Sequence, residues 1–284
     1  MNAGIVWITG AAGLIGNYLV QTASKFAPSV NVRALTRADL DLENFGAVRE
    51  AFRRESPAMV IHCAALTNTP TCEKNPALAR KLNVEVTEVL AEIAANIPFI
   101  FFSTDLVFDG RQGNYDESAA ASPLSVYGKS KVDAERFVLA NPKHTVVRTS
   151  LNFGQSLTGN RAFNEQMRAA VERGETLNLF IDEYRCPIPA EVTARAIWEL
   201  AAQDKPGLYH LTGSERLSRW EIGQLLAKYW APLEVKMQRE SIRDFRGLPR
   251  SPDTSFNCAK IQKLLSFPLP RFGEWLAALS RRLK

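Results

Sequence analysis

A tyrosine and a lysine one helical turn apart are the residues of this sequence best suited to chemistry. Tyr127 and Lys131 lie in the run SPLSVYGKSK, beyond a Ser-Thr-Asp triplet. Residues at positions i and i+4 share a helix face, so the Lys131 ammonium should lie near the Tyr127 phenol. A positive charge favours the phenolate, and we expect it to lower the tyrosine pKa from its usual value of about 10. Such a tyrosine can act as a general acid or base.

The elements that position this pair strengthen the interpretation. A lone Tyr-x-x-x-Lys is a common surface pattern, but here an apolar predicted strand, Phe99–Ser103, precedes it. This strand delivers Ser103 and Thr104 to the carboxyl edge of a sheet, where open α/β sheets bind ligands. Thr104 would hold a substrate carbonyl oxygen there by a hydrogen bond.

The chain begins with a glycine-patterned turn between a predicted strand and a predicted helix. The strand Ile5–Thr9 runs into Gly10-Ala-Ala-Gly13-Leu-Ile-Gly16. Glycine lets the main chain approach a pyrophosphate and lets helix and strand pack closely. The helix N-terminus favours the pyrophosphate charge. This context predicts dinucleotide binding.

The second predicted strand, Asn31–Leu35, ends in Thr36 and Arg37. An NAD-selective site usually has a carboxylate at this point for the ribose 2′-hydroxyl. None is present, and Asp39 and Asp41 come slightly later. The Arg37 guanidinium would suit a 2′-phosphate, so we expect NADPH, with NADH as the alternative. Arg37 as a solvated loop residue is the other interpretation.

Strand-like and helical runs alternate through the first 150 residues. Over the whole chain, the predicted helices are 14–26, 45–54, 76–95, 125–140, 162–173 and 190–202. The further predicted strands are 58–63, 145–149, 177–180 and 208–211. Alternation of this kind predicts an α/β fold with a doubly wound parallel sheet of the Rossmann type. We expect an NAD(P)-binding domain at 1–152, with a returning segment near 176–205. A smaller α/β domain at 153–284 would mainly bind substrate.

Composition restricts the function classes further. The 284 residues are 46% hydrophobic, and no apolar run is long enough to cross a bilayer. The N-terminus lacks secretory features, so we expect a cytoplasmic protein without a membrane partner. The net charge of +5 is scattered, which argues against nucleic acid as a partner. Four unpaired cysteines and three dispersed histidines predict no disulfide framework and no metal site. We expect Asp182 and Glu183 to be ordinary loop charges.

Ordered motifs along most of the chain resemble the extended short-chain dehydrogenase/reductase family, and within it the dTDP-4-dehydrorhamnose reductase branch. The motifs are GAAGLIG, VIHCAALTN, CEKNPALARKLN, FFSTDLVFDG, SPLSVYGKSKVDAE, VVRTSLNFG, GLYHLTG and SPDTSFN. The resemblance implies NADPH-dependent reduction of a nucleotide-linked 4-keto-6-deoxy sugar. It also leaves a homodimer open.

The resemblance implies a set of site residues. Thr104, Tyr127 and Lys131 would be catalytic, with Tyr127 protonating the sugar carbonyl oxygen and Lys131 also holding the nicotinamide ribose. The cofactor would be bound by Gly10, Gly13, Leu14, Ile15, Gly16, Asp41, Leu42, Ala64, Ala65, Tyr127 and Lys131, with Arg37 added from its position. The substrate would contact Thr104, Asp105, Leu106, Leu151 and Asn152. Arg148, Thr149 and Ser150 would lie near the nicotinamide, and Asn83 would be a structural polar anchor.

Two positions depart from the family pattern. Leu106 replaces a tyrosine after Ser-Thr-Asp, and Leu151 stands where a tryptophan often follows Arg-Thr-Ser. Each change removes ring area or a hydrogen bond, worth about 1 kcal/mol apiece. Two alternatives therefore stay open: another nucleotide-sugar oxidoreductase or epimerase, and a cofactor-binding regulatory subunit without turnover. The carboxylate pair of dehydratases is absent, because Leu106 follows Asp105.

Overall fold

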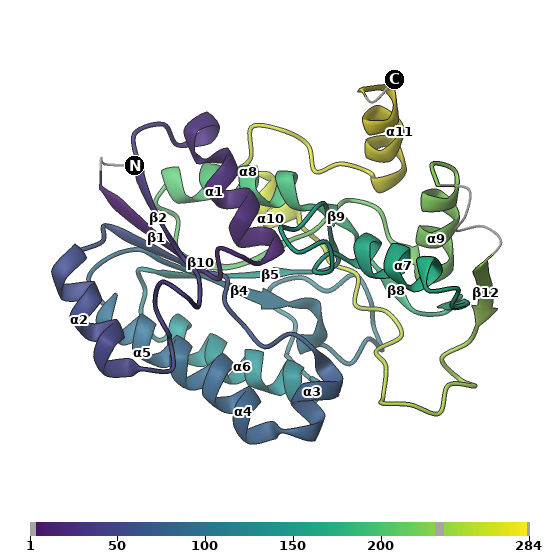
Figure 1. Ribbon diagram of the computed structural model, residues 1–284, viewed down its shortest axis with the longest axis horizontal. Helices are drawn as coiled ribbons and strands as arrows, with labels where there is room; N and C mark the ends of the chain where they lie inside the picture. Colours follow the sequence, from purple (N-terminus) through teal and green to yellow (C-terminus); the bar gives the residue numbers. More distant parts are fainter. Residues whose placement is uncertain (1–3, 231–235, 283–284) are drawn as a thin grey trace.

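A six-stranded parallel sheet forms the centre of the computed structural model, which describes residues 4–230 and 236–282. The strand order is β10-β5-β4-β3-β1-β2 (Figure 1). The strands are β1 (Ile5–Thr9), β2 (Asn31–Leu35), β3 (Met59–His62), β4 (Phe99–Thr104), β5 (His144–Thr149) and β10 (Gly207–Leu211). The predicted Rossmann-type sheet is confirmed, since all neighbouring strands pair in parallel.

The topological switch point lies between β1 and β3. The chain leaves β1 for β2 on one side and returns to β3 on the other, with Thr9 opposite His62. Crevices at such points, outside the carboxyl ends of the strands, are where open α/β sheets bind ligands. The glycine turn after β1 and the loop after β3 therefore flank the expected cofactor site.

Helices cover both faces of the sheet (Figure 1). One face packs Ile8 and Ile61 beneath α1 (Leu14–Phe26) and α8 (Ala190–Ala202), and Trp198 of α8 is buried in the same cluster. The other packs Trp7 and Phe101 against α2 (Phe45–Glu55), α5 (Val86–Ile93) and α6 (Val126–Leu139). Burial on both faces explains why the central strands are almost wholly apolar.

The long helix predicted over 76–95 is interrupted, so that prediction was wrong in its detail. After α3 (Thr69–Lys74), the chain forms α4 (Pro76–Arg80), a π-helical turn η1 (Lys81–Glu85) and then α5. Asn83 in this turn is 1% exposed and bonds both backbone groups of Leu66 and the Ser130 hydroxyl. The structural role predicted for Asn83 agrees with these contacts, and π-turns of this kind are common near functional sites.

The C-terminal half adds short strand pairs and helices beside the carboxyl edge. The pairs are β6 (Asn152–Phe153) with β9 (Ile188–Pro189), β7 (Leu177–Phe180) with β12 (Met237–Glu240), and β8 (Tyr184–Arg185) with β11 (Leu217–Ser218). The helices are α7 (Phe163–Glu172), α9 (Arg219–Ala227), α10 (Ala259–Gln262) and α11 (Phe272–Arg282), and a 3-10 turn η2 (Asp105–Val107) follows β4. Within the returning segment predicted at 176–205, α8 packs on α1. The strand that joins the sheet, β10, comes just after this segment and pairs with β5. The domain boundary after residue 152 stays a prediction.

Across the residues that the structure describes, no helix is both long and apolar enough to span a membrane.

Candidate active site

The glycine turn forms a cradle that side chains cannot enter. Gly10 has a φ of +66°, and a Cβ there would come within 2.6 Å of the Ala64 nitrogen. A Cβ on Gly16 would lie 2.4 Å from the Gly10 carbonyl oxygen. Both positions therefore require glycine, because any side chain would displace the backbone.

The N-terminus of α1 opens onto this cradle without a cap. Gly13 is the N-cap residue and no side chain bonds the first turn. The first intrahelical bond runs from the Asn17 N–H to the Gly13 carbonyl at 3.0 Å, so the N–H groups of Leu14, Ile15 and Gly16 precede it. Free N–H groups at a helix N-terminus bind anions well. The arrangement fits the pyrophosphate of a dinucleotide.

The other residues predicted to bind the cofactor lie at the same edge. Arg37 follows β2 with its side chain 80% exposed, and it forms a 2.8 Å ion pair with Glu43. Asp41 accepts a hydrogen bond from the Glu43 nitrogen, and Leu42 packs against the core beneath α2. Ala64 and Ala65 follow β3 at the switch point.

The three residues predicted to be catalytic come together between β4 and α6. Tyr127 and Lys131 are 8% and 2% exposed, and the Tyr127 phenol lies beside the Thr104 side chain at the end of β4. The Lys131 ammonium lies 4.0 Å from the centre of the Phe101 ring. Gly128 makes this approach possible, because a Cβ there would lie 2.3 Å from the Leu106 carbonyl oxygen.

The structure contradicts the expected direction of the Tyr127 pKa. Burial raises it, the Asp105 carboxylate adds to the rise, and the neighbouring Thr104 side chain only partly opposes them. Burial also lowers the pKa of Lys131 to about 7, while Glu135 counteracts part of that shift. Desolvation thus favours the neutral forms of both groups, and it outweighs the attraction that the helical spacing suggested.

A buried ion pair anchors α6 behind this group. Glu135, one turn beyond Lys131, accepts two bonds from Arg148, at 3.0 and 2.7 Å. The Ser103 hydroxyl also donates to Glu135, and Arg148 lies 3.4 Å from a ring nitrogen of His210. The network ties α6 to β4, β5 and β10. Glu135 was not predicted as part of the site, although its position eight residues after Tyr127 places it on the same face of the helix.

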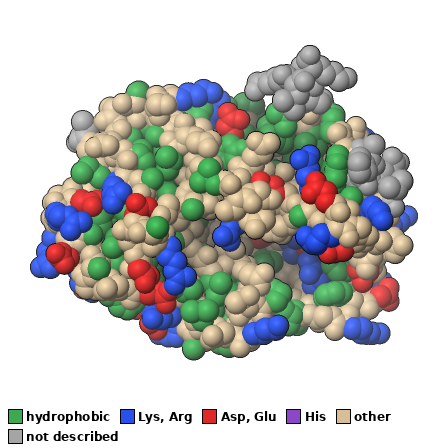
Figure 2. Space-filling view, viewed as in Figure 1, with side chains coloured by type: hydrophobic (Ala, Val, Ile, Leu, Met, Phe, Trp, Pro, Cys, Tyr) green, Lys and Arg blue, Asp and Glu red, His purple; other side chains and the backbone are tan. Residues whose placement is uncertain are grey.

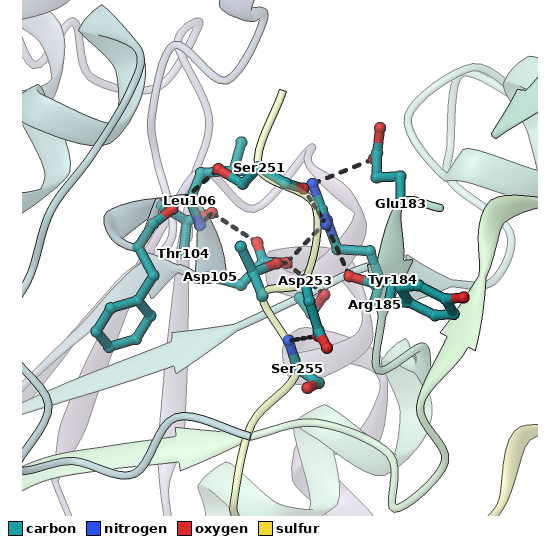
Figure 3. A network of polar contacts seen from close by, with 12 residues as sticks. Thr104, Asp105, Leu106, Glu183, Tyr184, Arg185, Ser251, Asp253 and Ser255 are labelled. Atoms are coloured by element: carbon teal, nitrogen blue, oxygen red, sulfur yellow. Dashed lines mark hydrogen bonds and ion pairs between the residues drawn. The ribbon is translucent and has the colours of Figure 1, made fainter. Parts of the chain in front are cut away.

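Asp105 is enclosed by partners from distant parts of the chain (Figure 3). Its oxygens accept bonds from Ser150 at 2.7 Å and Thr254 at 2.8 Å, and from Thr104 at 3.2 Å. The Arg185 guanidinium lies 3.3 Å away. With its oxygens engaged in this way, Asp105 holds the C-terminal segment against the catalytic strand.

Glu183 is the centre of an arginine cluster, so its expected role as an ordinary loop charge is wrong. It is fully buried and pairs with Arg185 at 3.1 Å, with Arg219 at 2.8 Å and with Arg250. These cations hold the pKa of Glu183 well below its usual value, although burial alone would raise it. One buried Arg219 nitrogen has no hydrogen-bond partner in the part of the chain that the structure describes. No local pattern predicts this cluster, because Arg219 and Arg250 lie far from Glu183 along the chain.

A cleft of about 730 Å³ extends from Thr104 at the end of β4 to the arginine cluster, and its described lining includes neither Tyr127 nor Lys131. Figure 2 shows the surface hollowed near the middle of this face, with basic side chains beside the hollow. The lining includes Thr104, Asp105, Leu106, Leu151, Glu73, Ser125, Arg185, Arg219 and Arg250. Asn152 is not among the lining residues described; its amide bonds Thr149 and Ser150, and its oxygen accepts from Thr193. Four of the five residues predicted to contact substrate therefore share one cleft.

Comparison with known proteins places this geometry in a family. Residues 4–284 match the RmlD substrate binding domain family. The chain belongs to that family. The predicted resemblance to the extended short-chain dehydrogenase/reductases, and to their RmlD-like branch, is confirmed.

Relatives of this RmlD-family chain fall into two functional groups. It is 30% identical to a dTDP-4-dehydrorhamnose reductase of Sinorhizobium fredii, over 94% of this chain and 93% of the relative. It is 29% identical to the methionine adenosyltransferase 2 subunit beta of Xenopus laevis, over 90% and 81%. A solved dTDP-4-dehydrorhamnose reductase of Bacillus anthracis in complex with NADP has a TM-score of 0.89, with 26% identity, and the match covers 99% of this chain and 100% of that one.

Proposed function

We propose that this protein is an oxidoreductase that uses NADPH to reduce a nucleotide-linked 4-keto-6-deoxy sugar, as dTDP-4-dehydrorhamnose reductases do. One observation carries the proposal: Thr104, at the end of the strand beside the Tyr127 helix, lines the same cleft as the three arginines that surround Glu183. The reductase relative, similar over almost its whole length, supports this choice.

NADPH would lie across the switch point. The turn of Gly10, Gly13 and Gly16, with the N–H groups of Leu14 and Ile15, would hold the pyrophosphate. Arg37, already oriented by Glu43, would face the 2′-phosphate, with Asp41 and Leu42 near the adenine and Ala64 and Ala65 beside the nicotinamide half. When bound, NADPH supplies a hydride to the sugar. The neighbour of known structure that holds NADP supports this choice of cofactor.

Tyr127 would supply the proton. Because burial raises its pKa, the phenol carries its proton throughout the neutral range. The Thr104 hydroxyl, which lies beside the phenol, would hold the substrate carbonyl oxygen next to it. Lys131, with a pKa of about 7, would replace the proton on Tyr127 as it is lost and hold the nicotinamide ribose.

The arginine cluster would bind the diphosphate of the substrate. Glu183 neutralises one of the three guanidinium charges and Asp105 another, so one positive charge remains near the cleft. The unpartnered nitrogen of Arg219 is a donor that a phosphate oxygen would satisfy. Binding energy from the nucleotide would then fix the keto carbon against the cofactor.

A second candidate function is cofactor binding without turnover. The similarity to a methionine adenosyltransferase subunit favours it. The placement of the Tyr127 phenol beside Thr104 supports the reductase, because a subunit without turnover has no need of a positioned proton donor. The homodimer and the cytoplasmic location expected from the sequence remain proposals of the same kind.

One assay distinguishes the reductase function from cofactor binding without turnover. The protein is mixed with NADPH and dTDP-4-keto-6-deoxyhexose, and the absorbance of the reduced nicotinamide is followed while product is detected by mass. We expect stoichiometric loss of NADPH and gain of the 4-hydroxy sugar. Tight NADPH binding without consumption, over a panel of nucleotide keto-sugars, would instead support the subunit function.

A further inference from the structure

Glu73 joins the substrate cleft to the helix that carries Tyr127. It lies near the end of α3, and its Oε1 accepts the N–H of Val126 at 2.7 Å. Val126 is the first residue of α6, directly before Tyr127. The Ser125 hydroxyl accepts from Gly128 at 3.0 Å, so two N–H groups of this helix end are bound by side chains.

Glu73 also differs from the other acidic residues of the cleft wall, because one of its carboxylate oxygens has no partner among the described residues. Three carboxylates line the cleft: Glu183 is enclosed by arginines, and Asp105 is engaged by Arg185 and by hydroxyl groups. The Glu73 side chain is half-buried, and among the described residues it has no ion pair and no bond beyond the one to Val126. Its second oxygen therefore remains available to a ligand.

The cleft wall around the second Glu73 oxygen has few other groups that could accept a hydrogen bond from a sugar. Leu106, Leu124 and Leu151 line the same cleft and offer no hydrogen bonds. The Ser150 hydroxyl is engaged by Asp105. A sugar bears several ring hydroxyls, and each loses a water when it enters the cleft. Leaving such a group buried and unpaired costs more than the net gain of a typical hydrogen bond, so acceptors in the wall favour binding.

We infer that Glu73 is a substrate-binding residue that accepts a hydrogen bond from a ring hydroxyl of the sugar. This inference rests on the proposed function and adds a determinant of sugar choice to it. Because the same carboxylate bonds the start of α6, the sugar ring and the Tyr127 helix are positioned by one rigid group. A hydroxyl in the wrong place or configuration would leave the Glu73 oxygen unpaired and the ring misplaced.

The test uses Glu73→Gln in the full-length protein. Glutamine keeps the oxygen that accepts from Val126 but replaces the second oxygen by an amide donor. We expect the KM for the keto-sugar to rise about tenfold or more, as for a lost hydrogen bond to a charged group. NADPH affinity and melting temperature should stay at wild-type values. Glu85→Gln, which alters a glutamate outside the cleft, is the matched control.

Substrate analogues make the test specific. In a series of nucleotide keto-sugars that each lack one ring hydroxyl, the wild type should lose about tenfold in kcat/KM for one member. Glu73→Gln should show no further loss for that member. An unchanged KM in Glu73→Gln, or equal losses across the series, would overturn the inference while wild-type turnover stands. A wild type that neither binds nor reduces the keto-sugar would overturn the proposed function as well.

Discussion

At the scale of single residues, Lys131 is held where a charge is costly. It is buried against the Phe101 ring, and burial lowers its pKa from 10.5 to about 7. In the unfolded chain, Lys131 keeps its proton until the pH approaches the ordinary lysine pKa of 10.5. Between these two values the unfolded lysine is protonated and the folded one is not. Linkage then requires the free energy of unfolding to rise with pH across this window.

The lowered pKa of Lys131 predicts that Lys131→Met changes the free energy of unfolding by an amount that depends on pH. The wild-type free energy of unfolding should contain a contribution that rises by up to about 1.4 kcal/mol per pH unit from about 7 towards 10. The variant lacks this contribution, so it should be the more stable protein near neutrality, and its advantage should shrink as the pH rises. Urea denaturation of both proteins across this range measures the difference. Parallel curves would show that the lysine pKa is ordinary.

At the scale of elements, the glycine turn and α1 act as one unit. A Cβ at Gly16 would meet the Gly10 carbonyl at 2.4 Å, whereas a Cβ at Gly46 in α2 would meet only the Asn44 side chain at 3.5 Å. A side chain can therefore be accommodated at Gly46 but not at Gly16, although both glycines lie in the first turn of a helix.

We predict that Gly16→Ala lowers the free energy of unfolding by about 2 kcal/mol or more and weakens NADPH binding at least about tenfold. The added methyl group would push the turn away from α1 and disturb its free N–H groups. Gly46→Ala should be neutral or stabilise by up to about 1 kcal/mol, since alanine favours helices. Thermal melting and a fluorescence titration with NADPH measure both effects. Equal behaviour of the two variants would refute the assigned role of the turn.

Local patterns predicted the central elements well because each carries its own signal. The apolar run Phe99–Ser103 and the spacing of Leu14–Phe26 arise from burial on a sheet and on a helix face. The π-turn around Asn83 did not follow from spacing, because it depends on bonds to Leu66 and Ser130. The Tyr127 pKa was predicted in the wrong direction for the same reason, since its burial is a tertiary property.

At the scale of the whole molecule, Glu183 links the C-terminal half to the cleft. Its arginine partners come from β8, the start of α9 and the segment before Ser251. No local pattern brings these together, which explains why this end of the site was absent from the sequence analysis. Thr104, Tyr127 and Lys131, by contrast, lie on the neighbouring elements β4 and α6, so local spacing was enough to predict that they come together.

We predict that Glu183→Gln lowers the free energy of unfolding by about 3–5 kcal/mol near neutral pH, because it leaves buried arginines without their counter-charge. The native pKa of Glu183 is depressed, so this stabilisation is present above the ordinary value of 4.5 and fades as the pH falls below it. Glu175→Gln, which breaks an exposed pair with Arg173, should cost less than about 1 kcal/mol. Guanidinium denaturation at neutral and acid pH checks both. A Glu183→Gln protein as stable as wild type would contradict the role of the cluster.

Proton donation by Tyr127 is tested most directly by NADPH consumption with dTDP-4-keto-6-deoxyhexose in Tyr127→Phe. Tyr115→Phe is the matched control, because it removes a buried hydroxyl that bonds Asp109 away from the cleft. We predict that Tyr127→Phe still binds NADPH but lowers kcat by about a hundredfold to ten-thousandfold, and that Tyr115→Phe retains turnover. Turnover by Tyr127→Phe at the wild-type rate would contradict the account.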